Sequence, residues 1–218
     1  MRLFPKPYLL LSSLLIFVCV SCRISKYKHP FESNRVAINE AIFIPILKGN
    51  EAVKFKTTLD VLKNHLSGIL IVKRTDSASI HLIYVTELGM KLFDFEWKEK
   101  KMIAKYVFEP LNKPSLIKAL ETNLKNIFLL DIYDSTILRL QNKQLKTYYE
   151  SESFKHRYIL IDSLMGLSTQ AIFKGNCKAS LINYTYNNYT TSYSQIKCIQ
   201  YGLVKIHIEL NEIAKTND

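Results

Sequence analysis

Histidine is the residue of this chain best suited to chemistry near neutral pH, because imidazole both transfers protons and binds metals. The chain has five, scattered over 218 residues: His29, His65, His81, His156 and His207. Metal-binding motifs place at least two of their ligands a few residues apart. No two of these histidines have such spacing, so we predict no metal site and no cofactor.

Carboxylates and serines form no clearer catalytic pattern. Asp94 and Glu96 would share one face of a strand, as a general acid and base could, but solvent-facing strands alternate polar residues in the same way. Ser67 and Ser163 have no recognisable partners, and the chain contains no Gly-rich phosphate loop or nucleophile elbow. We therefore expect a protein that is not an enzyme, although triads do assemble from distant residues.

The N-terminus has the parts of a secretory signal. Arg2 and Lys6 give a positive start, and residues 9–18 are apolar apart from two serines. This run is shorter than the roughly 20 apolar residues that span a bilayer. We predict a signal peptide over residues 1–21.

Cys22 follows this segment directly. The pair Ser21-Cys22 resembles the lipobox of bacterial lipoproteins, although Cys19 stands where leucine is usual. That resemblance implies a lipid anchor on Cys22, followed by a tether over residues 22–34 and one domain over residues 35–218. The alternative is an ordinary signal peptide with an incidental cysteine.

The chain is basic, with 30 Lys and Arg against 19 Asp and Glu. Residues 1–21 contain two cations and no acid, which leaves 28 cations and a net charge of +9 after their removal. Such an excess favours contact with anionic lipid or polyanions. The charge is spread along the chain without a nucleic-acid motif, so we expect a membrane partner and no nucleic acid.

Most of the chain is predicted to form short strands joined by hairpins, because the breaks between apolar runs are too short for parallel crossovers. The expected strands are residues 53–59, 66–73, 80–85, 90–97, 102–108, 145–149, 157–161, 167–173, 179–186, 189–199 and 203–210. The segment 66–72 is apolar on both faces, which indicates either that both faces are covered or that one lines an apolar cavity. A mainly β fold of about 11 antiparallel strands follows.

One amphipathic helix interrupts the strands. It begins at Pro114, which suits the first helical turn. Its apolar side is expected to lie on the concave face of the sheet, over a cavity or as part of a filled core, and comprises Leu116, Ile117, Leu120, Leu124, Ile127 and Phe128.

The last hairpin predicts a disulfide. If Asn187-Asn188 forms a two-residue turn, Cys177 and Cys198 lie directly opposite each other on neighbouring strands. An exported protein would meet oxidising conditions that permit this bond. The alternative is two reduced, buried cysteines.

Three segments resemble the lipoprotein-localisation carrier and acceptor (LolA/LolB-like) superfamily. Residues 66–72 resemble the Ser-Gly-led second strand of the acceptor, residues 87–95 its Leu-Gly hairpin, and residues 203–210 the final strand. The likeness covers residues 53–130 and the C-terminal strands, and the segment after the helix lacks the expected Pro- and Trp-containing stretch. The chain as a whole resembles lipoproteins of Bacteroidota-type bacteria.

This resemblance implies a curved antiparallel half-barrel with the helix on its concave face. It also implies binding of lipid or lipoprotein acyl chains, in lipid trafficking on the periplasmic side of the outer membrane. The alternative function is a cell-envelope scaffold with a filled core. The sequence indicates neither the cargo nor the oligomeric state.

Overall fold

A computed structural model describes most of the chain after residue 51, together with one earlier strand. The described residues are 33–37, 52–61, 64–75, 79–131, 136–141, 145–152, 155–162, 166–175, 177–186, 193–202 and 204–213. The predicted signal peptide, Cys22 and most of the predicted tether lie outside these residues. Within the described part, no helix is both long and apolar enough to cross a membrane.

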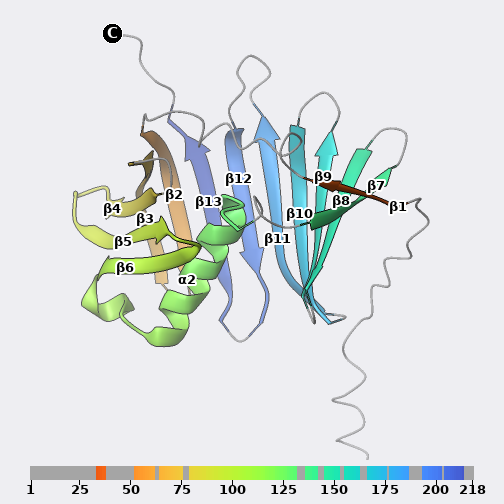
Figure 1. Cartoon of the computed structure of the whole chain (residues 1–218). Coiled ribbons are helices and arrows are strands. Elements are labelled where there is room, and N and C mark those ends of the chain that lie inside the picture. The colour runs from red at the N-terminus through yellow and green to blue at the C-terminus, as the bar shows by residue number, and fades with distance from the viewer. Residues whose placement is uncertain are drawn as a thin grey trace, which may run out of the picture.

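The described strands form one open antiparallel sheet that curves around a helix (Figure 1). In chain order the strands are β1 Ser33–Ala37, β2 Val53–Val61, β3 Asn64–Arg74, β4 Ile80–Thr86, β5 Lys91–Lys98, β6 Lys101–Val107, β7 Thr136–Gln141, β8 Leu145–Glu152, β9 Lys155–Asp162, β10 Gly166–Lys174, β11 Cys177–Tyr186, β12 Tyr193–Gln200 and β13 Ile206–Glu212. A 3-10 turn, η3 Glu109–Leu111, precedes helix α2 Pro114–Ile127. The prediction of a mainly β half-barrel with one helix is confirmed.

The spatial order of the strands is β1-β7-β8-β9-β10-β11-β12-β13-β2-β3-β4-β5-β6. Adjacent strands of the sheet are consecutive in sequence except at two places. The last strand, β13, pairs with β2, so that Ile208 lies opposite Leu59. At one edge β1 pairs with β7, so that Arg35 lies opposite Leu138.

These edge strands correct two predictions. β1 and β7 were not expected, so the described sheet has 13 strands where the sequence predicted about 11. β1 begins at Ser33, inside the predicted tether 22–34. Its partner lies about a hundred residues away along the chain, and no local hairpin pattern reveals such a pairing.

The core lies between α2 and the concave face of the sheet. Strands β2, β4 and β13 alternate buried with more exposed residues, as expected for a sheet with one covered face. Position 68 of β3 requires glycine, because a Cβ atom there would lie 2.0 Å from the backbone oxygen of Val85 on β4.

The predicted register of the last hairpin is wrong. Cys198 lies opposite Ile182, whereas Cys177 lies five residues further along β11. Five residues of strand span roughly 17 Å. The hairpin carries a bulge between Thr185 and Tyr186, and Tyr186 pairs with Tyr193, whereas the assumed two-residue turn would pair it with Tyr189. Cys177 and Cys198 are both described, and no disulfide joins them.

Candidate functional site

The apolar side of α2 packs against the core. Leu116, Leu120, Leu124, Ile127 and Phe128 are each at most 3% exposed, and Ile117 is partly buried beside them. The ring of Phe128 lies 6.3 Å from that of Phe55 on β2. The predicted position of the stripe is therefore right, but these six side chains belong to a filled core rather than to the wall of a cavity.

A groove lies along a different side of the helix. It encloses about 590 Å³ between α2 and the ends of strands β9 to β12. From the helix it is lined by Ser115, Lys118, Ala119, Thr122, Asn123 and Asn126, whose spacing of three or four residues places them on one side. The sheet contributes Lys155, Ile172, Lys174, Cys177, Lys178, Ala179, Ser180 and Gln200, and the chain after β12 contributes Tyr201, Gly202 and Val204. Its volume is in the range typical of small-molecule sites.

The polar groups at the base of this groove satisfy one another. The side-chain nitrogen of Asn123 donates to the Gln200 side chain and to the carbonyl oxygen of Ala119. Gln200 in turn donates to the Val204 carbonyl oxygen over 2.9 Å. The Cys198 thiol donates to Asn123 Oδ1 over 3.5 Å. Because these groups are already paired, the base of the groove is not arranged for catalysis.

Cys198 itself is unsuited to act as a nucleophile. It is fully buried, and this burial raises the pKa of its thiol to about 12. A hydrogen bond with Ser180 opposes that shift only in part. Since the thiolate is the reactive form, the side chain is chemically inert at neutral pH.

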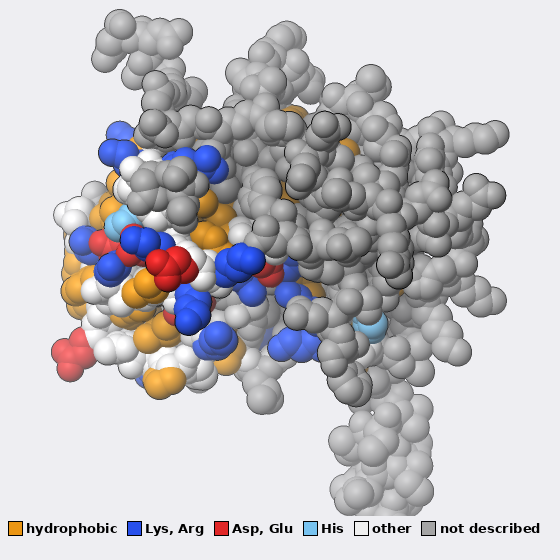
Figure 2. Space-filling view, viewed as in Figure 1, with side chains coloured by type: hydrophobic (Ala, Val, Ile, Leu, Met, Phe, Trp, Pro, Cys, Tyr) orange, Lys and Arg blue, Asp and Glu red, His pale blue; other side chains and the backbone are white. Residues whose placement is uncertain are grey.

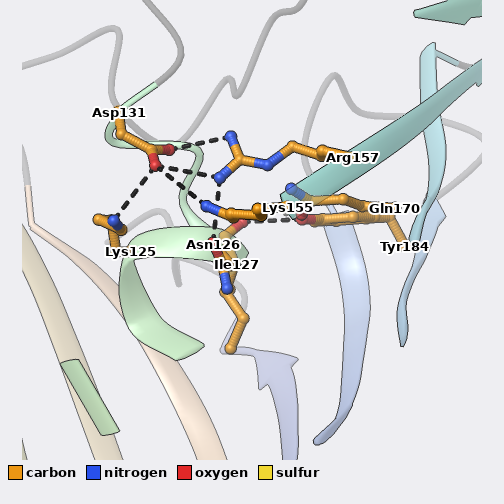
Figure 3. A network of polar contacts seen from close by, with 8 residues as sticks. All are labelled: Lys125, Asn126, Ile127, Asp131, Lys155, Arg157, Gln170 and Tyr184. Atoms are coloured by element: carbon orange, nitrogen blue, oxygen red, sulfur yellow. Dashed lines mark hydrogen bonds and ion pairs between the residues drawn. The ribbon is translucent and has the colours of Figure 1, made fainter. Parts of the chain in front are cut away.

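A network of charged and polar groups holds the C-terminal end of α2 against the sheet (Figure 3). Arg157 of β9, only 1% exposed, makes two 3.0 Å hydrogen bonds to the two carboxylate oxygens of Asp131. It also donates to the Asn126 side chain over 3.2 Å. Tyr184 of β11 donates to the main-chain oxygen of Ile127 over 2.9 Å, which satisfies a carbonyl in the last helical turn.

Gln170 of β10 completes this network. Its amide nitrogen donates to the Asn126 main-chain oxygen over 2.9 Å, and its amide oxygen accepts from Arg157 Nε over 3.3 Å. Burial alone would raise the pKa of Asp131, but Arg157, with smaller contributions from Lys125 and Lys155, lowers it to about 2. The network therefore fixes one wall of the groove through Asn126, which lines it.

The carboxylates Asp94 and Glu96 lie among cations on β4 to β6. His81 is 3.6 Å from Asp94 and 3.5 Å from Glu96. Lys105 binds Glu96 over 2.8 Å, and this hydrogen bond lowers the pKa of Glu96. The two carboxylates do share one face of β5, but that face is not solvent-facing as expected, because the Asp94 side chain is only 15% exposed and that of Glu96 12%.

Other predicted features remain apart from the groove. Asp60 of β2 lies between His65 of β3 and His207 of β13, and its Oδ2 atom is 3.5 Å from Nδ1 of His207. Within the described residues no group of three or more His, Cys, Asp and Glu side chains could hold a metal ion. The lysines and polar residues of the groove were missed by sequence reasoning, because they come from one helix and four strands and share no local motif.

Comparison with known proteins shows only distant similarity. No protein-family profile and no curated protein sequence matches the chain. Among solved structures, a LolA superfamily protein from Nitrosomonas europaea is similar with a TM-score of 0.47 and 9% identity, over 84% of this chain and 91% of that one. A DUF1329 family protein from Desulfovibrio piger has a TM-score of 0.38 and 7% identity, over 80% and 91%. At these values, no function can be transferred to this chain.

Proposed function

We propose that this protein binds a hydrophobic ligand, a lipid or a lipoprotein acyl chain, in the groove between α2 and strands β9 to β12. The groove itself, about 590 Å³ beside a filled core, is the observation that carries this proposal. The lipid expected on Cys22 would hold the protein on the periplasmic side of the outer membrane, where such ligands are handed between membranes and carriers.

The walls of the groove offer apolar contacts suited to a chain. Ala119 and Ala179 face it from the helix and the sheet, and Ile172 and Val204 line it as well. Each methylene group removed from water contributes roughly 0.8 kcal/mol. Binding of this kind needs no covalent step, which agrees with the expectation that the protein is not an enzyme.

Filling the groove provides the test. The full chain carrying Cys22→Ser, which removes its own lipid from the measurement, is purified from bacterial cells, and its mass with any bound ligand is measured by native mass spectrometry. We expect a bound lipid or acyl peptide that is lost in Ala179→Trp, because the indole would occupy the groove. Ala104→Trp, at an exposed position on β6, is the matched control and should keep the ligand.

The opposite result would contradict the proposal. If the protein carries no ligand, and stays free of ligand after incubation with phospholipid vesicles, it is not a carrier. Retention of the same ligand by Ala179→Trp would place the binding site elsewhere.

A second candidate function is a cell-envelope scaffold that binds no lipid. The filled core under α2 favours it, because the six apolar helix residues are used in packing. Under this hypothesis both tryptophan variants would behave like the unmodified protein.

A further inference from the structure

The groove is lined by four lysines. Lys118 comes from α2, and Lys155, Lys174 and Lys178 come from β9, β10 and β11. No aspartate or glutamate is present among the described residues that line it. Figure 2 shows Lys and Arg side chains gathered on the face of the molecule that carries α2. The lining of the groove thus combines apolar contacts with a local excess of positive charge.

Three of these lysines form a row across the sheet. Lys155 and Lys174 are direct cross-strand partners, and Lys178 pairs with Phe173, the residue before Lys174. Since side chains two residues apart share a face, Lys155 is on the same face as the buried Arg157. Lys155 and Lys174 therefore lie on the concave face, at the end of the groove, and Lys178 lines the groove from the neighbouring strand β11.

Such a row is unfavourable by itself, because like charges directly opposite each other destabilise a sheet. Glu152 of β8 is the other cross-strand partner of Lys155, and the Asp131 carboxylate lies 3.9 Å from Lys155. That carboxylate already accepts both hydrogen bonds of Arg157, and Lys125 lies 3.3 Å from it. Lys174 and Lys178 are exposed. An anion bound beside Lys174 would reduce its repulsion with Lys155.

We propose that the lysine row binds the anionic head group of a single-chain amphiphile whose hydrocarbon chain lies in the groove. The inference rests on the proposed function and defines its ligand as an acidic amphiphile, with a carboxylate or a phosphate monoester as head group. A lysine ammonium group is a point charge and lacks the planar, two-pronged geometry of a guanidinium group, so the lysine row accepts either a carboxylate or a phosphate. The lysine row therefore disfavours ligands with neutral or zwitterionic head groups.

Three ligands with the same chain test the head group by isothermal calorimetry: dodecanoate and dodecyl phosphate, each below its critical micelle concentration, and dodecanol below its solubility limit. We expect both anions to bind at least tenfold more tightly than the alcohol, and this advantage to shrink as salt is added. In Lys174→Gln/Lys178→Gln the anions should lose about threefold to fivefold in affinity for each lysine removed, and dodecanol should bind as before.

Lys54→Gln/Lys56→Gln is the matched control. It removes the same charge from two exposed residues of β2 that lie outside the groove, and it should leave all three affinities unchanged. Equal affinity of the anions and the alcohol would refute the head-group inference and leave the proposed function standing. Failure of all three ligands to bind would refute both. Inorganic phosphate, added alone, should not compete; full competition would show a site for free anions instead.

Discussion

Replacing Asp131 with Asn should destabilise the protein strongly, because it removes the partner of a buried guanidinium. Arg157 is 1% exposed and has both of its 3.0 Å carboxylate contacts with Asp131. Asn keeps the shape of the side chain but not its charge. Arg157 also has hydrogen bonds to the neutral amides of Asn126 and Gln170.

The expected loss of folding free energy in Asp131→Asn follows from the pKa of Asp131 and from the burial of Arg157. A fall of the Asp131 pKa from its ordinary value of 3.8 to about 2 corresponds to about 2 kcal/mol of stabilisation at neutral pH. Removing one partner of a buried ion pair typically costs about 3–5 kcal/mol, and we expect a total loss in this range for Asp131→Asn. This is a large part of the 5–15 kcal/mol that typically separates folded from unfolded states.

Because the folded-state pKa is lowered, the stabilisation is present above pH 3.8 and is lost as the pH falls towards 2. Urea denaturation followed by circular dichroism should show this loss in the unmodified protein, and Asp131→Asn should lack it. Adding Arg157→Met to Asp131→Asn should recover much of the free energy of unfolding, because the buried charge is gone. Asp60→Asn, at an exposed position, should cost less than about 1 kcal/mol. A loss below 1 kcal/mol for Asp131→Asn, or an unchanged acid response, would refute the reasoning.

Three further predictions concern single residues. Gly68→Ala should prevent stable folding, seen as loss of the cooperative thermal transition, because its Cβ would lie 2.0 Å from the Val85 oxygen. In the native protein a maleimide should label the exposed Cys177 and spare the buried Cys198, and urea should expose both; peptide mapping that finds them bridged would contradict the register. Cys22→Ser should abolish incorporation of a palmitate analogue, and continued labelling would place the lipid elsewhere.

Local pattern was enough to predict the meander and the helix. Strands β2 to β6 lie where apolar runs and short polar breaks placed them, and α2 begins at the predicted Pro114. Hairpins and helices depend on contacts between residues close in sequence, so their signals are contained in short windows. The burial of Leu120 and Phe128 followed from helical spacing in the same way.

Only the tertiary structure decided the long-range pairings and the position of the groove. β1 pairs with β7 and β13 pairs with β2, and these partners are far apart in sequence. No short sequence pattern indicates such pairings. The predicted register of the last hairpin is wrong by five residues: four because Tyr186 pairs with Tyr193 and not with Tyr189, and one because of the bulge at Thr185. Whether a stripe covers a cavity or a core depends on how side chains from several strands fill the space. Lys155 and Lys174 become neighbours only through the β9–β10 register, because residues 19 positions apart meet only once both strands are in place.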